Sequence, residues 1–105
     1  MSIILSRLAR QDLDEIRTYT VKTWGRAQWL SYFAGLTKAF EAISRNPEKG
    51  RSRDLFHPGL RSVNYQRHII FYKRIVANDN LPVLLRIIHQ KRYLPALIYY
   101  EDLDG

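Results

Sequence analysis

The chain has 105 residues and a mass of 12.5 kDa, which is enough for one domain but not for two independent cores. It is 46% hydrophobic and 26% charged, and no apolar run approaches the roughly 20 residues of a membrane span, so we expect neither disorder nor membrane insertion. The absence of cysteine excludes disulfide frameworks, thiolate metal sites and cysteine nucleophiles. The net charge of +7 points to an acidic partner.

The start of the chain predicts a short strand followed by a helix. Residues 3–5 are β-branched or leucine, and this apolar run is too short for the core of a signal peptide, so we expect an unprocessed cytoplasmic protein. Ser6 is typical of a helix cap, which predicts a helix from about Arg7. Apolar or small side chains then recur at intervals of three and four residues, at Ala9, Leu13, Ile16, Thr20 and Trp24.

Gly25 predicts the end of this helix and the start of another. From Arg26 the same spacing continues through Ala27, Leu30, Phe33, Leu36, Phe40 and Ile43. Asn46-Pro47 ends the pattern, because proline lacks a backbone donor and disfavours helix in the residue before it. Two amphipathic helices joined at a single glycine predict an antiparallel helical hairpin.

A loop and three strands complete the predicted domain. Residues 47–59 are rich in proline and glycine and predict a loop, whereas residues 60–65, 69–76 and 83–88 predict strands, with a turn at residues 78–80. The order β-α-α-β-β-β predicts an α+β fold of two layers, with the hairpin packed on a small, mostly antiparallel sheet. We expect a domain over residues 1–95, an acidic tail over residues 96–105, and a single core built from Leu30, Phe33, Leu36, Phe40, Phe71, Leu85 and Ile87.

The excess positive charge is confined to one part of the chain. Residues 45–92 hold eleven basic and three acidic residues, a balance of +8, whereas residues 1–44 have a balance of +2 and residues 93–105 of −3. The excess therefore belongs to the predicted loop and strands. A solvated sheet face would account for single arginines, but the cluster favours binding of phosphates, an acidic peptide or an acidic protein groove.

Only one constellation of residues suggests chemistry. The sequence lacks a glycine-rich phosphate loop, a nucleophile elbow and metal-ligand spacing, so we expect neither a metal nor a cofactor. The predicted strands are expected to bring together Arg61, Arg67, Tyr72, Arg86, His89, Lys91, Arg92 and Tyr93. Cleavage of RNA would need a base, cations and an acid, which His89, the arginines and a tyrosine would supply. Alternatively, His89 caps a strand end, and Arg86 forms an ion pair with Asp12 or Glu15.

The chain resembles the ParE toxins of the RelE/ParE superfamily over about residues 3–95. The resemblance is carried at the C-terminal side by residues 61–72 and by Leu85-Arg86-Ile-Ile-His89-Gln90-Lys-Arg92. Earlier in the chain it rests on Ala9-x-x-Asp12-Leu13-x-x-Ile16, Trp24-Gly25, Ala39-Phe40-x-x-Ile43, Asn46-Pro47, Gly50-Arg51 and Pro58-Gly59-Leu60-Arg61. No single piece is very specific, and the order and spacing of the pieces carry the match.

This resemblance implies the toxin of a type II toxin–antitoxin module, of the kind often carried on plasmids or chromosomal islands. The partner is then a ParD-like antitoxin whose acidic segment folds on the toxin, in a hetero-oligomeric complex. ParE-like members inhibit DNA gyrase, whereas RelE-like members are ribosome-dependent endoribonucleases that cut messenger RNA. The apolar stretch at residues 69–71 stands where ribonuclease members carry polar or basic side chains, which favours a non-enzymatic inhibitor of gyrase.

The resemblance and the charge together suggest which residues bind. We expect the antitoxin to contact Arg61, Arg67, Arg74, Arg86, Trp29 and Phe33, and the target to contact Lys91, Arg92 and Tyr93. Were the protein a ribonuclease, its catalytic residues would be Arg61, Arg86, His89 and Tyr72. Direct binding of nucleic acid is the least favoured reading of the charge.

Overall fold

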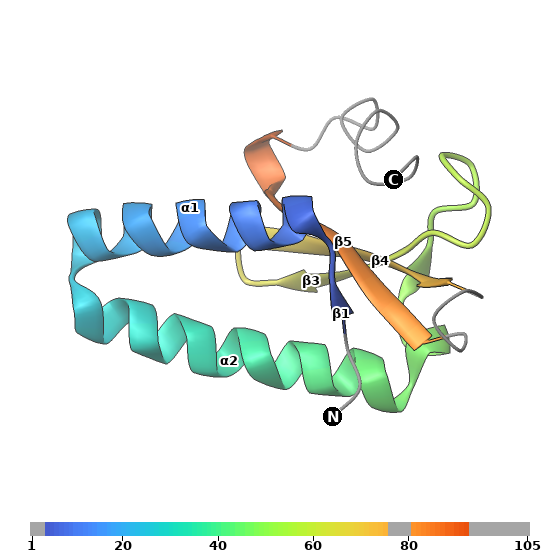
Figure 1. Ribbon diagram of the computed structural model, residues 1–105, viewed down its shortest axis with the longest axis horizontal. Helices are drawn as coiled ribbons and strands as arrows, with labels where there is room; N and C mark the ends of the chain where they lie inside the picture. The colour runs from blue at the N-terminus through green and yellow to red at the C-terminus, as the bar shows by residue number, and fades with distance from the viewer. Residues whose placement is uncertain (1–3, 76–80, 93–105) are drawn as a thin grey trace.

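A helical hairpin packed on a mixed sheet makes up the structure, a computed structural model that describes residues 4–75 and 81–92 (Figure 1). Along the chain the described elements are β1 (Ile4–Leu5), α1 (Arg7–Trp24), α2 (Arg26–Arg45), η1 (Pro47–Lys49), β2 (Arg51–Ser52), β3 (Arg61–Tyr65), β4 (His68–Ile75), β5 (Leu81–His89) and η3 (Gln90–Arg92). In this described part, the strand order is β1-β5-β4-β3-β2, with β1 parallel to β5 and the other neighbours antiparallel. The predicted two-layer α+β fold is confirmed.

Ser6 fixes the point at which the chain leaves the sheet and enters α1. Its side-chain oxygen accepts the N–H of Ala9 at 3.0 Å, as an N-cap does. Its hydroxyl donates to the carbonyl of Leu85 at 2.9 Å, and its backbone N–H donates to the carbonyl of Leu84 at 2.9 Å. The predicted cap is therefore confirmed, and it also ties the start of the helix to β5.

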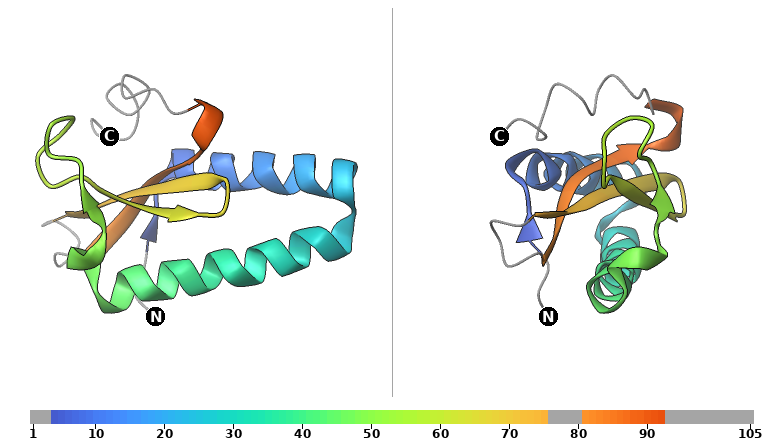
Figure 2. Two further views of the ribbon diagram at one scale, coloured as in Figure 1. Left: turned by 180° about the vertical axis from the view of Figure 1, so that it is seen from behind. Right: turned by 90° about the vertical axis from the view of Figure 1, so that its right-hand side faces the viewer.

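Gly25 makes the turn between the two helices. Its φ is +95°, a conformation that side-chain-bearing residues rarely adopt, and its N–H donates to the carbonyl of Val21 at 3.0 Å. The tip of the hairpin projects well beyond the strands, as both Figure 1 and Figure 2 show. The side of α1 near this tip consequently stays open to solvent, with Tyr19 and Trp24 among the exposed large side chains.

The segment predicted as a loop after α2 contains a further strand. The C-terminal end of α2 is as expected, since Asn46 donates its N–H to the carbonyl of Ala42 at 3.0 Å and Pro47 opens η1. Residues Arg51 and Ser52 then form β2, which pairs with β3. A strand of two exposed polar residues has no hydrophobic alternation, so the sequence pattern did not predict it.

The prediction of a single core is wrong, because the sheet is apolar on both faces. One cluster joins the helices to the sheet and includes Leu36, Phe40 and Ile87. A second cluster contains Phe71 and Leu85, together with Leu60, Ile69, Val83 and Ile88. Successive residues of a strand point to opposite faces, so a continuous apolar run such as residues 69–72 feeds both clusters.

Two residues of the predicted core lie at the surface of α2. Leu30 is 51% exposed and Phe33 is 38% exposed. The stripe that packs inward is formed instead by Trp29, Leu36, Phe40 and Ile43, all buried. Regular spacing therefore identified the helix correctly but assigned too wide a face to the core.

The described residues contain no helix that is long and apolar enough to cross a membrane. The predicted turn at residues 78–80, the expected tail at residues 96–105 and the expected target contact Tyr93 lie outside the described residues.

Candidate functional site

The residues of the expected catalytic constellation lie at two separate places on the sheet. Arg61 of β3 lies opposite Tyr72 of β4, whereas His89 of β5 lies opposite His68 of β4. Tyr72 and His68 are four positions apart in β4, which separates them by about 13 Å at the rise of a strand. The prediction that the strands gather these side chains in one region is wrong, because the register puts Arg61 and Tyr72 in one pocket and Arg86 and His89 in another.

A buried carboxylate of α1 holds Arg86. The Nε of Arg86 donates to Asp12 Oδ2 at 2.9 Å, and its second terminal nitrogen donates to Asp12 Oδ1 at 3.1 Å. Asp12 Oδ2 also accepts the backbone N–H of Ile87 at 2.9 Å. Since β1 pairs with β5 only at Val83 and Leu84, Asp12 supplies the acceptor that a longer neighbouring strand would supply. The expected ion pair of Arg86 is confirmed, with Asp12 as its partner.

Asp12 is not among the apolar or small side chains whose spacing predicted α1, yet it is only 9% exposed. Asp12 follows Ala9 by three residues and precedes Ile16 by four, so it lies on the same stripe as the core-facing side chains. The position of a carboxylate within an apolar stripe was the sequence signal for a buried ion pair, because a buried charge requires a paired cation.

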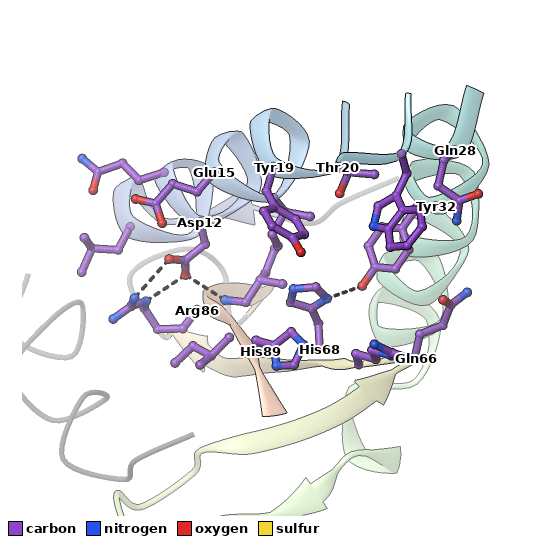
Figure 3. A pocket seen from close by; sticks show the side chains of 17 residues that line it. Asp12, Glu15, Tyr19, Thr20, Gln28, Tyr32, Gln66, His68, Arg86 and His89 are labelled. Atoms are coloured by element: carbon purple, nitrogen blue, oxygen red, sulfur yellow. Dashed lines mark hydrogen bonds and ion pairs between the residues drawn. The ribbon is translucent and has the colours of Figure 1, made fainter. Parts of the chain in front are cut away.

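An open groove of about 910 Å³ lies between the helical hairpin and the end of the sheet that carries His68 and His89 (Figure 3). Arg67 and Arg86 also line it. In Figure 3, Tyr32 points from α2 toward His68, and the two imidazoles lie next to each other. Within residues 4–75 and 81–92, no cluster of three or more histidine, cysteine, aspartate or glutamate side chains is placed to hold a metal ion.

Three rings that line this groove pack edge to face. The rings of His68 and His89 meet edge to face, with centroids 5.3 Å apart, and the ring of Tyr32 meets His68 at 5.6 Å. Tyr32 Oη and His68 Nδ1 are hydrogen-bonded. The pKa of His68 is lowered to about 4, mainly by burial and also by the neighbouring His89, while Asp12 acts in the opposite direction. Burial raises the pKa of Tyr32, and Tyr65 adds to the rise.

His68 is therefore neutral near pH 7, and the tautomer of its ring sets which partner donates in the hydrogen bond between Nδ1 and the neutral Tyr32 hydroxyl. A group with a pKa near 4 holds its neutral form at pH 7 but accepts a proton poorly, since catalytic bases act best when their pKa lies near the working pH. At the edge of the cluster, His89 Nδ1 accepts the backbone N–H of Lys91 at 3.1 Å. The cluster has the features of a packed structural junction.

The depressed pKa of His68 predicts a loss of stability in weak acid. The unfolded chain takes up this proton near pH 6.5 and the folded chain only near pH 4, so between these values the unfolded state holds more protons and the free energy of unfolding falls as the pH falls. We expect a decrease of about 1–2 kcal/mol from this residue, allowing for its partial exposure. Urea unfolding at pH 4 to 7 measures it.

The matched variant is His68→Gln, whose amide oxygen can still accept the Tyr32 hydroxyl but cannot titrate. Its free energy of unfolding should change less between pH 6.5 and pH 4 than that of the parent chain. Equal pH dependence of the two proteins would show that His68 is not the group responsible.

A second pocket, of about 190 Å³, lies where η1 meets β3 and β4. Arg61 donates from one terminal nitrogen to the carbonyls of Glu48 at 3.1 Å and Gly50 at 2.8 Å. Its other terminal nitrogen lies 3.2 Å from Glu48 Oε1, and a nitrogen of Arg74 lies 3.1 Å from Glu48 Oε2. One carboxylate thus bridges two arginines.

Tyr72 lines this pocket and has a structural role. Its hydroxyl donates to the carbonyl of Pro47 at 2.7 Å and accepts the N–H of Gly50 at 3.0 Å. Burial raises the pKa of Tyr72, while the Gly50 hydrogen bond lowers it, and the residue is 1% exposed. Tyr72, one of the catalytic residues expected for a ribonuclease, therefore fastens η1 to the sheet.

Of the remaining basic candidates, Arg67 lines the open groove. Arg67, at the turn between β3 and β4, is exposed and forms no ion pair with any acidic residue that the structure describes. Lys91 is exposed in η3, and Arg92 is the last residue of that element. η3 directly follows His89, which lines the groove, so Lys91 and Arg92 come next after this residue in the chain.

Apolar side chains also remain exposed on α2. The rings of Trp29 and Phe33 stack with centroids 5.2 Å apart, and Leu30 and Phe33 are partly exposed. We call Leu30 and Phe33 the α2 apolar surface; Trp29, an expected antitoxin contact, is buried and only its stacking on Phe33 links it to this surface. Apolar side chains that remain in contact with water on a helix are typical of a surface for a partner.

Comparison with known proteins gives a consistent result. Residues 3–94 match the family described as "ParE toxin of type II toxin-antitoxin system, parDE". The chain is 33% identical over 86 residues to Toxin ParE1 of Caulobacter vibrioides, covering 82% of this chain and 85% of the relative. It is 32% identical over 88 residues to Toxin ParE1 of Mycobacterium tuberculosis, covering 84% of this chain and 88% of the relative.

A similar fold is found in the solved structure described as "Chromosomal ParDE TA system from P. aeruginosa". The TM-score is 0.70 at 21% sequence identity, with 85% of this chain and 95% of that chain covered. This likeness concerns the arrangement of helices and strands.

Proposed function

This chain belongs to the ParE toxin family of type II toxin–antitoxin systems, and we propose that it pairs with a ParD-type antitoxin and, when free of it, inhibits DNA gyrase. The observation that carries the non-enzymatic part of this proposal is the separation of Arg61 and Tyr72 from Arg86 and His89. Cleavage of RNA needs a base, an acid and cations around one phosphate, and these residues do not surround one site.

The antitoxin would bind through the α2 apolar surface and through arginines of the two pockets. Phe33 and Leu30 offer apolar area, and Arg67 offers a guanidinium at the groove. Arg61 and Arg74 add two further guanidinium groups at the second pocket. Arginine forms planar two-point contacts with carboxylates, which suits an acidic segment that folds on binding. Arg86, the last residue of the expected set, is bonded to Asp12, so its contribution would be to position β5.

The α2 apolar surface is tested by Phe33→Ala. We expect the affinity for the ParD-type antitoxin encoded beside this chain to fall by at least about tenfold, because an aromatic anchor at an interface contributes more than 1 kcal/mol when removed. The free energy of unfolding should change by less than the binding free energy, since Phe33 is 38% exposed. Isothermal titration calorimetry and urea unfolding give the two quantities.

Leu55→Ser is the matched control for this variant. Leu55 is 95% exposed and lies in the segment between β2 and β3, so its loss removes exposed apolar area without touching α2. The assignment of the antitoxin surface to α2 would be contradicted if both variants lost the same antitoxin affinity, or if neither variant lost any.

Inhibition of gyrase is what membership of the ParE family implies for the target. We place the target contact at Lys91 and Arg92 of η3, together with Tyr93. In the sequence these are two basic residues followed by an aromatic one, and neither Lys91 nor Arg92 lines the second pocket with Arg61 and Arg74. The mechanism is one of binding, in which the toxin stabilises the gyrase–DNA complex in a cleaved state.

The cellular response to expression distinguishes this proposal from the ribonuclease alternative. Inhibition of gyrase predicts DNA-damage signalling and filamentous cells, while protein synthesis continues during the first minutes. A ribosome-dependent ribonuclease predicts an arrest of protein synthesis within minutes and loss of that arrest in Arg61→Ala. Incorporation of labelled methionine, followed alongside a DNA-damage reporter, gives opposite results for the two functions.

A further inference from the structure

We propose that Glu48 is an internal competitor for a carboxylate of the antitoxin, and that Arg61 and Arg74 form a preorganised two-arginine site which an acidic side chain of the antitoxin enters when Glu48 swings out. This inference rests on the proposed pairing with an antitoxin and assigns the chemistry of one contact within it. The intramolecular carboxylate already shows the geometry of the site, since its two oxygens lie 3.2 Å from Arg61 and 3.1 Å from Arg74.

Arg61 keeps its position independently of the Glu48 side chain. One of its terminal nitrogens donates to the backbone carbonyls of Glu48 and Gly50, at 3.1 and 2.8 Å. The carbonyl of Glu48 belongs to the backbone of η1, which Tyr72 fastens through its bonds to Pro47 and Gly50. The guanidinium therefore remains oriented when the carboxylate leaves, and a fixed donor binds without the cost of being ordered.

The Glu48 side chain, in contrast, is only weakly held. It is 59% exposed, against 31% for the side chain of Arg61, so water competes for the carboxylate and screens its attraction to both arginines. An ion pair of this kind exchanges easily. An acidic residue on a segment that is bound elsewhere to the toxin has a high local concentration and displaces Glu48 at little cost.

The size of the pocket favours a single side chain over a nucleic-acid backbone. Its volume of about 190 Å³ is below that of ordinary small-molecule sites, and its walls include Pro47, Gly59 and the Tyr72 ring. A carboxylate fits this space, as Glu48 does. Proteins bind the phosphates of a DNA duplex through exposed basic side chains spread over a broad surface, and this small pocket does not provide such a surface. Binding of DNA is therefore the alternative that the test must exclude.

The test compares Glu48→Ala and Glu48→Gln with the parent chain in binding the ParD-type antitoxin. We expect both variants to bind about two- to fivefold more tightly, the range that an exposed ion pair of modest strength allows. Asp14→Ala is the matched control, because Asp14 is also exposed and its removal raises the net charge equally without touching either arginine. Its affinity for the antitoxin should stay at the parental value.

Two further arms make the result specific. In an Arg74→Gln background the gain from Glu48→Ala should disappear, since one of the two arginines is gone. A 20-base-pair DNA duplex, used as the probe for phosphate, should bind the Glu48 and Asp14 variants equally. A gain for DNA that appears in Glu48→Ala alone would identify a phosphate site and overturn the proposal.

Failure of this inference is distinguishable from failure of the proposed function. A parent chain that does not bind the antitoxin at all contradicts the pairing itself. A parent chain that binds, with affinity unchanged or weakened in both Glu48 variants, keeps the pairing and overturns the internal competitor. Circular dichroism of each variant shows whether it is folded before its affinity is compared.

Discussion

Replacement of Asp12 by alanine should lower the free energy of unfolding by about 3–5 kcal/mol, the largest effect that we expect of any single substitution. The carboxylate is 11% exposed and the Arg86 side chain 15% exposed, so removing Asp12 leaves a charge with little access to water. It also leaves the N–H of Ile87 without its acceptor. For a domain of this size, such a loss lowers the melting temperature by more than about 10 °C.

Asp12→Asn separates the charge from the hydrogen bond. The amide oxygen can still accept the N–H of Ile87, so we expect a smaller loss of about 1–2 kcal/mol. Asp14→Ala, two residues away on an exposed face of α1, should change the free energy of unfolding by less than about 0.5 kcal/mol. Urea unfolding followed by circular dichroism ranks the three variants, and an Asp12→Ala protein as stable as Asp14→Ala would contradict the role assigned to the pair.

Gly50→Ala should cost about 2–4 kcal/mol, because the new methyl group would meet the ring of Tyr72. A Cβ atom at Gly50 would lie 2.2 Å from the Tyr72 hydroxyl oxygen and 2.8 Å from the ring carbon that carries it. Tyr72 cannot move aside easily, since its side chain is 1% exposed and its hydroxyl is bonded at two points. The backbone of Gly50 itself is ordinary extended chain, with a φ of −64°, so the cost comes from the contact.

A double-mutant cycle with Tyr72→Phe tests this explanation. Phenylalanine removes the oxygen that the methyl group would strike, so Gly50→Ala should cost less in the Tyr72→Phe background than in the parent chain. The two losses would instead add, within about 0.5 kcal/mol, if Gly50 mattered for a reason unrelated to Tyr72. Tyr72→Phe should also leave toxicity intact, because the proposed inhibition of gyrase by binding gives the hydroxyl no catalytic role.

The helical hairpin could be predicted from the sequence because its signals are local. Ser6, Gly25 and Asn46-Pro47 mark helix ends by short-range chemistry, and each of them ends or begins a helix in the structure. Strand β2 could not be predicted, since it exists only through its pairing with β3. The two cores were also beyond the sequence pattern, because a strand that is apolar throughout does not show which face meets the helices.

The residues of the candidate site could be named from the sequence, but their positions relative to one another in the sheet could not. Nothing in the spacing of Arg61, Tyr72 and His89 shows that the strand register places Arg61 and His89 opposite residues four positions apart in β4. The pairing of Arg86 with Asp12 was foreseeable, since a buried arginine requires a carboxylate. The bridge that Glu48 forms between Arg61 and Arg74 was not, because η1 reaches β3 and β4 only through tertiary packing.

The positions of the basic residues change what the net charge of +7 suggests for this protein. Among the arginines of residues 45–92, Arg86 forms an ion pair with Asp12, and Glu48 bridges Arg61 and Arg74. The positive charge is thus partly organised by internal carboxylates, in geometries that an acidic peptide can copy. Such an arrangement suits a protein that is bound by an acidic antitoxin.

The central claim, that this toxin acts by binding gyrase, is tested most directly by supercoiling of relaxed plasmid DNA with purified gyrase. We predict that the toxin inhibits supercoiling and causes linear DNA to accumulate, and that the ParD-type antitoxin restores activity when added in equal amount. Undiminished supercoiling in the presence of excess folded toxin that still binds its antitoxin would contradict the account.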